Sequence, residues 1–371
     1  MIVIAATAHI VNGADPDRFY QMVQEDEALE WATFWAFLLA AGANVLAAIR
    51  LARGTRGLPW FVAGLGLFCF VVAMEEISWG QRVFGYRPPV YFLENNYQQE
   101  FNFHNVIESD FRQDIFVGLI AAYGCVLPLM MLIGPLARGI RRVGIIAPPT
   151  LLAPGFAVAL GIYIDYPWRF AGEVVELIVG LGFLFAGGLC ATQLATGAGK
   201  SRASGWRGGV RILLLLGVTL CLGVANAALS QVQRASSPEA VRAAERELEA
   251  MKNDFFAVAE QQDGLIPVRC GLHKRLYTFV ESYDKRFLEH GEFAALTSQG
   301  LPDERAAFFI DPWNDPYWIR SRCSKDRSRR SVFLYSFGPN RRRDSNKWEH
   351  RPDDLGVYLI RTDEPSATAP R

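Results

Sequence analysis

Paired glutamates and one histidine are the residues of this chain whose types and spacing could do acid–base or metal chemistry. His104 lies in a polar segment that follows the apolar run 61–74. The glutamates come in pairs at the ends of apolar stretches: Glu27 and Glu30, Glu75 and Glu76, and Glu173 and Glu176. A carboxylate in hydrocarbon is costly unless it is paired or protonated, and it usually faces the interior of a helix bundle. We therefore expect several carboxylates to lie near one imidazole.

Such a cluster could hold a metal ion, or could transfer protons on a lipid or lipid-linked substrate at the membrane surface. The candidate catalytic residues are then Glu75, Glu76, His104, Glu173 and Glu176. The spacings E-x-x-H and H-x-x-x-H, which would strengthen a metal assignment, do not occur in the chain. An ion-coupled transporter is a further hypothesis, but the apolar stretches lack the paired Gly or Pro breaks expected at a midplane site.

The same region also has a structural interpretation. Glu75 and Trp79 are four residues apart and would share one face of a helix, and Glu76 could pair with Arg82. A lone histidine among Asn and Gln side chains is more often a hydrogen-bonding residue than a metal ligand. The residues expected to tie the polar segment to the helix ends are Ser78, Trp79, Gln81, Arg82, Asn102 and Asn105.

Six apolar stretches must position these residues. A helix needs roughly 20 mostly apolar residues to cross a bilayer. The stretches cover residues 31–49, 58–79, 114–134, 145–163, 172–192 and 212–229. The sequence therefore predicts a polytopic α-helical membrane bundle of about six transmembrane helices.

The charges of the connections between these stretches alternate and predict the orientation. The connections after the first, third and fifth stretches hold ten Lys or Arg residues and no Asp or Glu. Most carboxylates of the bundle lie in the other connections. The positive-inside rule places the Arg-rich connections in the cytoplasm. Everything after residue 230 is then expected on the periplasmic side of a bacterial inner membrane, with the lipid bilayer as one partner.

The chain is expected to divide into three regions. Residues 1–30 form an outer segment or the remnant of an extra helix, residues 31–229 form the transmembrane domain, and residues 230–371 form a periplasmic domain. The long outer link 80–112 is aromatic, and we expect a short helix at 90–97 to lie at the level of the lipid headgroups. The formal net charge is zero, which gives no indication of nucleic-acid binding.

The cysteines follow the same division. Cys69, Cys125, Cys190 and Cys221 lie in apolar stretches, where free cysteine packs as a small hydrophobic residue. The other two lie in the outer domain, and an oxidising compartment would join them. We therefore expect a disulfide between Cys270 and Cys323.

The outer domain begins with a helix and continues with short strands. Ser237 is a good N-cap, and apolar residues at a period of 3.6 predict an amphipathic helix over 238–262. The expected strands cover residues 276–280, 307–310, 317–320, 331–336 and 355–360.

Three pieces of this domain resemble the globular domain of the major pseudopilins of type II secretion. The pieces are Asp311-Pro312-Trp313 with Pro316-Tyr317, then Tyr335-Ser336-Phe337-Gly338, then Asp353-Asp354-Leu355. The resemblance covers about residues 238–360 and implies a long helix packed on a small antiparallel sheet. A pilin begins at a processed N-terminus with a Glu at its fifth position, whereas this helix lies in mid-chain. The domain is therefore not expected to polymerise as a filament subunit.

In that family the last loop often binds calcium. The corresponding oxygen ligands here are Asn340, Asp344, Asp353 and Asp354. The same loop carries several arginines, which oppose a divalent cation. A loop closed by Arg–carboxylate pairs is the alternative, so calcium stays a hypothesis.

A second resemblance covers about residues 25–190. The string EEISWGQRVFGY, followed by ENNYQQEFNFHN, resembles a motif of an uncharacterised family of bacterial multipass membrane proteins. The motif has Gly where this chain has Gln99. The resemblance implies a membrane fold and no particular reaction. Together, these patterns favour a membrane protein whose outer domain contacts a periplasmic or envelope protein, with an intramembrane enzyme as the alternative.

Overall fold

A computed structural model gives two compact units, which we describe separately. It describes residues 1–24, 27–54, 59–96, 98–196, 203–234, 237–283, 289–326, 328–341, 343–345, 349–350 and 354–362. The first, the membrane unit, comprises Met1–Val83 and Phe101–Ser230; the second, the C-terminal unit, comprises Phe84–Glu100 and Gln231–Arg371. The outer link is therefore divided, because its part Phe84–Glu100, which we call the connector, folds with the C-terminal residues.

Four helices among the described residues are long and apolar enough to cross a membrane, namely Ala28–Arg53, Asp110–Met130, Ala171–Thr192 and Gly209–Ser230. They match the first, third, fifth and sixth predicted stretches. The other two stretches form shorter helices. Helix α4 (Trp60–Glu76) has 17 residues and α10 (Ala153–Asp165) has 13. The structure thus supports a membrane protein and bears out four of the six predicted spans by length and composition.

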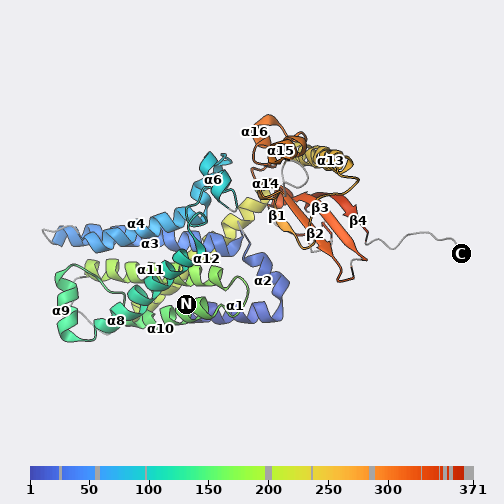
Figure 1. The fold of residues 1–371 in the computed structure, drawn as a ribbon. Coiled ribbons are helices and arrows are strands. Elements are labelled where there is room, and N and C mark those ends of the chain that lie inside the picture. The colour runs from blue at the N-terminus through green and yellow to red at the C-terminus, as the bar shows by residue number, and fades with distance from the viewer. Residues whose placement is uncertain are drawn as a thin grey trace. The chain divides into compact units, whose positions relative to one another are not determined.

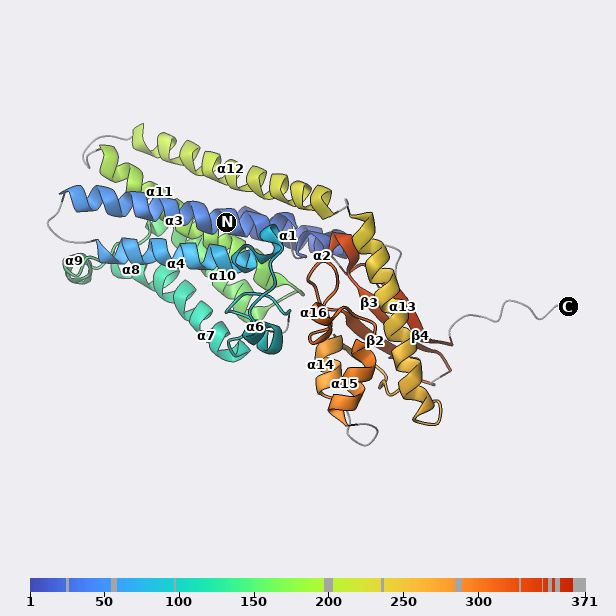
Figure 2. The same ribbon diagram turned by 90° about the horizontal axis from the view of Figure 1, so that it is seen from above.

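Helix α11 (Ala171–Thr196) lies at the centre of the membrane unit, next to α3 (Ala28–Gly54), with α4 along α3 (Figures 1 and 2). Gly180 allows the close contact of the two central helices, because a Cβ there would lie 3.0 Å from the Cβ of Ala36. Helix α12 (Ala203–Arg234) runs alongside them (Figure 2), and its Gly223 meets the backbone of α3. Small residues thus set the helix spacing.

The third span is not a uniform α-helix. It consists of α7 (Ser109–Leu119), a π-helical segment (Ile120–Val126) and α8 (Leu127–Met130). Within the π-helical segment, Tyr123 stacks on Phe183 with ring centroids 4.8 Å apart. The connection that follows contains helix α9 (Gly134–Arg142), which carries the three arginines of that connection.

The first residues form helices α1 (Ile2–Ala14) and α2 (Pro16–Met22) of the membrane unit. Helix α1 packs against α10 and α11, and Ala5 is buried there. The second predicted stretch ends earlier than expected, because α4 stops at Glu76. The fourth stretch starts later, at a short 3-10 turn over Thr150–Leu152 before α10.

In the C-terminal unit a long helix packs on a small antiparallel sheet (Figure 1). Helix α13 (Pro238–Glu260) begins as predicted, and the Ser237 side chain accepts a hydrogen bond from the Ala240 N–H. The strands are β1 (His273–Arg275), β2 (Trp318–Cys323), β3 (Arg330–Ser336) and β4 (Leu355–Arg361), paired in that order. Helix α13 buries Leu248, Met251 and Phe255 in one core with Ile319 and Leu334 of the sheet.

Two of the predicted strands are wrong. Residues 276–280 belong to helix α14 (Leu276–Glu281), because Leu276, Phe279 and Val280 bury side chains at helical spacing rather than on alternate positions. Residues 307–310 form a turn, and an isolated β-bridge joins Ile310 to Pro316. Helices α15 (His290–Ser298) and α16 (Asp303–Ala306) and strand β1 are additional elements.

A buried ionic network joins α13 to the rest of this unit. The Tyr317 hydroxyl donates to Glu247 Oε2 at 2.7 Å, and Arg305 Nη1 donates to the same oxygen at 2.8 Å. Arg305 Nη2 also bonds Glu247 Oε1, which completes a two-point contact. Arg305 Nη1 additionally donates to the Ile310 carbonyl at 2.8 Å. One carboxylate therefore joins three segments of the domain.

The connector is an integral part of the C-terminal unit. Its helix α6 (Val90–Asn95) buries Leu93 completely against Phe308 and Ile310. A guanidinium N–H of Arg275 donates to the Asn96 carbonyl at 2.6 Å. The helix predicted at 90–97 is therefore present up to Asn95, but its buried apolar side chain packs on protein rather than on lipid.

Gln99 completes this attachment. Its backbone φ is +57°, in the left-handed region that favours glycine. The buried Gln99 side-chain amide donates to the carbonyls of Leu93, at 3.2 Å, and Phe308, at 3.3 Å. The glutamine thus bonds both the connector and the C-terminal residues.

Candidate functional site

The end of α4 positions the first pair of glutamates. The helix stops at Glu76, and Ser78 and Trp79 then adopt left-handed backbone angles, with φ of 47° and 54°. This turn, rather than a continuous helix, brings Trp79 back over Glu75. The indole Nε1 of Trp79 donates to Glu75 Oε1 at 2.6 Å. The predicted contact between these two residues is made, but by a different local structure.

Glu75 is fully engaged by the returning link. Its Oε2 accepts hydrogen bonds from the backbone N–H groups of Phe103, at 2.6 Å, and His104, at 3.0 Å. The His104 ring Nδ1 lies 3.4 Å from the same oxygen. A carboxylate that accepts several N–H groups holds a chain segment in place. This geometry favours a structural role for Glu75 and His104.

Further bonds hold the link against the same helix end. Gln81 Oε1 accepts from the Phe101 N–H at 2.7 Å, and the Asn102 amide lies 3.5 Å from Ser78 Oγ. Trp79 packs against the rings of Phe101 and Phe103, at centroid distances of 6.2 and 6.4 Å. The structure thus brings together four of the predicted structural residues, namely Ser78, Trp79, Gln81 and Asn102. The side chain of Arg82 lies outside the described part of the chain.

Glu76, the next residue, has a different environment. It makes no hydrogen bond with the described residues, and it lies close enough to Glu30, Glu173 and Glu176 to be repelled by their charges. Glu30 and Glu173 lie in the first turns of α3 and α11. Three helix ends thus meet as the sequence suggested. We call Glu30, Glu76, Glu173 and Glu176 the acidic cluster.

Arg112 is the positive charge near this cluster, and sequence reasoning missed it. It lies on α7, close enough to Glu173 and Glu176 to attract both. Its Nη1 donates to the His104 carbonyl at 2.9 Å and to Asn105 Oδ1 at 3.3 Å. A signal was present, because an arginine at the acidic end of a predicted span departs from the charge pattern of the other connections.

The acidic cluster and Arg112 can hold a proton or attract a cationic or zwitterionic group. Across the described residues, no three His, Cys, Asp or Glu side chains are placed to hold a metal ion. The five predicted catalytic residues therefore separate into two groups. Glu75 and His104 fasten the link, whereas Glu76, Glu173 and Glu176 belong to the acidic cluster.

The proposed calcium loop uses its oxygens for other bonds. Asp354 accepts from the backbone N–H groups of Asp344, at 3.1 Å, and Ser345, at 2.6 Å. The Asn340 amide donates to Asp344 Oδ2 at 2.6 Å. Arg341, in the same loop, makes a two-point ion pair with Asp315. The described oxygens are turned to internal N–H donors and do not fit a calcium site; Asp353 lies outside the described residues.

Two of the three pieces that carry the pseudopilin resemblance contact each other. Asp311 Oδ1 accepts from the backbone N–H groups of Trp313 and Asp315, both at 2.9 Å, and so closes the turn after residue 310. Its Oδ2 accepts from Ser336 Oγ at 2.6 Å, which joins the first piece to the second. Asp311 and Ser336 are fully buried. Their geometry is that of a structural turn.

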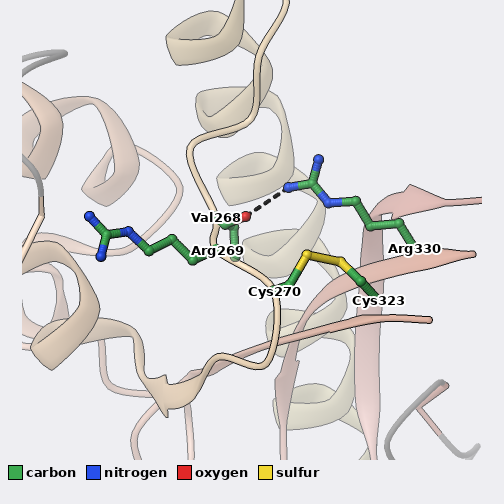
Figure 3. A pocket seen from close by; sticks show the side chains of 5 residues that line it. All are labelled: Val268, Arg269, Cys270, Cys323 and Arg330. Carbon is green, nitrogen blue, oxygen red and sulfur yellow. Dashed lines mark hydrogen bonds between the residues drawn. A yellow bond between two sulfur atoms is a disulfide. The ribbon is translucent and has the colours of Figure 1, made fainter. Parts of the chain in front are cut away.

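The predicted disulfide is confirmed, and it lines a pocket. Cys270 and Cys323 are bonded, with Cα atoms 5.5 Å apart. The pocket beside them has a volume of about 530 Å³ and is lined also by Val268, Arg269 and Arg330 (Figure 3). We call it the disulfide pocket.

No known family, curated protein or solved structure matches this chain.

Proposed function

We propose that this chain is a six-helix integral protein of a bacterial inner membrane that presents a pseudopilin-like domain in the periplasm for contact with another envelope protein. The observation that carries the proposal is the connector, which folds into the C-terminal unit. Because the connector and the C-terminal residues form one unit, both must lie on the same side of the membrane, which restricts the number of crossings between them.

The shared unit requires an even number of crossings. The connector and the residues after 231 lie in one compact unit, so both must face the same side of the membrane. Three long apolar helices lie between them, Asp110–Met130, Ala171–Thr192 and Gly209–Ser230. A fourth crossing is therefore needed, and the apolar helix Thr150–Asp165 is the candidate. At 1.5 Å per residue it spans about 24 Å, which a locally thinned bilayer accommodates.

The charges of the connections and the disulfide both support a periplasmic position of the C-terminal unit. The Arg-rich connections, including Arg138, Arg141 and Arg142 of α9, favour the cytoplasm. The disulfide of the C-terminal unit favours an oxidising compartment, because cytosolic disulfides are rare. The four cysteines of the membrane unit are free. These two independent arguments agree on a periplasmic C-terminal unit.

The interaction role rests on the architecture of the domain. A long helix on an antiparallel sheet and the contact of Asp311 with Ser336 are consistent with a pseudopilin-like domain, and pseudopilins assemble with other envelope proteins. The bonds of Glu75 to the link support a structural role for this helix end rather than chemistry at that carboxylate.

Reporter fusions test the topology. A reporter active only outside the cytoplasm should be active when fused after residue 362 or inserted near Val90, and inactive when placed in α9. A reporter active only in the cytoplasm should give the reverse pattern. Activity of the C-terminal fusion inside the cell would overturn the proposed orientation.

Crosslinking in cells tests the interaction. A photoreactive amino acid at exposed Leu265 or Phe256 of the C-terminal unit should give a discrete adduct with one envelope protein. The same probe at lipid-exposed Leu213 of α12 is the matched control and should not give that adduct. Absence of any adduct from a scan of the domain surface would contradict an interaction role.

The acidic cluster supports a second candidate, an intramembrane enzyme acting on a lipid or lipid-linked substrate. The observation that favours it is that Glu76 and Glu176 approach each other without hydrogen bonds to the described residues, with Arg112 nearby. Native mass spectrometry of the purified protein should then show a co-purifying lipid that is lost in Glu76→Gln. Retention of that lipid in Glu76→Gln, or its equal loss in the exposed-site variant Glu249→Gln, would remove this candidate.

A further inference from the structure

The disulfide pocket lies where the sheet of the C-terminal unit ends. Cys323 is the last residue of β2, and Arg330 is the first residue of β3. The disulfide joins Cys323 to the segment before β1, and the Leu272 N–H donates to Ser321 Oγ at 3.1 Å in the same region. Covalent and backbone bonds therefore hold the pocket wall in a fixed shape.

The pocket is lined in part by basic residues. Of its five lining residues, two are arginines and none is acidic. Figure 3 shows Arg330 next to the disulfide and reaching the Val268 carbonyl, whereas Arg269 extends to the other side. Arg330 Nη2 donates to that carbonyl at 2.7 Å, and its Nε is buried without a hydrogen bond.

Arg330 is therefore a partly buried cation with only a neutral acceptor among the described residues. Burial lowers its pKa. The nearest acid in sequence, Asp326, instead accepts hydrogen bonds from the hydroxyls of Ser324 and Ser328. Removing a charge from water without a partner is unfavourable, so an anion in the pocket would stabilise this arrangement.

The chain segments that contribute to the pocket are also rich in basic residues. The segments 268–275 and 320–330 together hold nine Lys or Arg residues and a single Asp. Guanidinium groups bind phosphate oxygens through geometrically matched, charge-assisted hydrogen bonds. The pocket volume of about 530 Å³ lies in the range of small-ligand sites. We propose that the disulfide pocket binds a phosphate group, supplied either by an anionic lipid headgroup or by a soluble phosphate compound, with Arg330 as its main contact.

Binding can be measured on the full-length protein in detergent with radiolabelled inorganic phosphate. We expect a Kd of about 1 mM or tighter for the unaltered chain. Arg330→Gln should weaken binding by about tenfold or more, because it removes one charge-assisted contact. Lys325→Gln removes the same charge from an exposed residue that does not line the pocket, and it should leave binding within about twofold. Equal losses in both variants, or no binding to the unaltered chain, would overturn the proposal.

The disulfide provides a second readout that does not depend on measuring affinity. Because both cysteines line the pocket, a bound phosphate group should slow their reduction by dithiothreitol, compared with chloride at equal ionic strength. Protection in phosphatidylglycerol nanodiscs without added phosphate would identify the lipid headgroup as the source. Protection only by dissolved phosphate would identify a soluble ligand. Reduction at the same rate under all conditions would contradict binding at this place, and Arg330→Gln with its disulfide intact serves as the folded negative control.

Discussion

The two units treat buried carboxylates in opposite ways. In the C-terminal unit, Glu247 is held by Arg305 and Tyr317, and Asp315 is held by Arg341. In the membrane unit, Glu76 makes no hydrogen bond with the described residues, and Glu30, Glu173 and Glu176 lie close enough to repel its charge. One unit neutralises its acids locally, and the other gathers them at helix ends.

This difference distinguishes carboxylates with a structural role from those that could take part in chemistry. A paired and hydrogen-bonded carboxylate is costly to break and fixes a single arrangement of the chain. Unpaired acids at a membrane helix end are expensive, and they mark sites where protons or ligands act. Glu75 is an exception in the membrane unit, because it is hydrogen-bonded in the same way as the acids of the C-terminal unit.

The largest effect is expected for Glu247→Gln. It leaves the partly buried Arg305 without its anionic partner, so the free energy of unfolding of the C-terminal unit should fall by about 3–5 kcal/mol. Pulse proteolysis of the full chain across a urea series measures this loss. Glu249→Gln, two residues along the same helix, breaks an exposed pair with Lys252 and should change stability by less than about 1 kcal/mol. Similar losses in the two variants would contradict the distinction between buried and exposed pairs.

Removal of the disulfide should come next. Cys270→Ser with Cys323→Ser opens a loop that joins residues 53 apart in sequence. The expected loss of stability is about 2–4 kcal/mol. Alkylation of the denatured, unreduced protein should label the four free cysteines of the membrane unit and no others. Labelling of either Cys270 or Cys323 would show that the C-terminal unit lacks the disulfide and does not differ from the membrane unit in this respect.

Two adjacent glutamates give the sharpest comparison within the membrane unit. Glu75→Gln places an amide N–H against backbone donors of Phe103 and His104, and should destabilise the link by about 2 kcal/mol. Glu76→Gln removes a charge that its neighbours repel, so it should leave stability unchanged or raise it. Hydrogen exchange of residues 101–105 reports the effect. If Glu76→Gln loosened this segment as much as Glu75→Gln, the division between bonded and unbonded acids would not hold.

Taken per pH unit, the smallest effect is a pH dependence of the C-terminal unit. Burial, together with the charge of Asp315, raises the pKa of Asp311 to about 7. An unfolded Asp has a pKa of about 3.9, so the folded state keeps a proton that the unfolded state has lost between these values. The free energy of unfolding should therefore fall as pH rises from about 4 to about 7, by up to about 1.4 kcal/mol per pH unit.

Asp311→Asn mimics the protonated form and should flatten this part of the pH profile. Urea unfolding of the full chain at a series of pH values measures the slope. Asp303→Asn changes an exposed residue and should leave the slope as it is. A stability that rises with pH in the unaltered protein would show that hydrogen bonds from Ser336, Trp313 and Asp315 outweigh burial at Asp311.

The elements that sequence alone identified are those with a strong local signal. Helix α13 follows from a 3.6-residue apolar period and a serine cap, and strands β3 and β4 follow from runs of β-branched and aromatic residues. The residues of α14 were mistaken for a strand, because a short segment with four apolar or aromatic residues fits both structures until its burial is known.

Composition and short-range spacing were enough to predict the division of the chain by hydropathy, four spans by length and composition, the disulfide partners and the gathering of acids at helix ends. Three further features could be seen only in the folded chain. The connector belongs to the C-terminal unit, Glu75 is hydrogen-bonded whereas Glu76 makes no hydrogen bond with the described residues, and Arg112 approaches the acidic cluster. Each of these depends on contacts between residues far apart in sequence, and no local pattern specifies which distant donor reaches a given carboxylate.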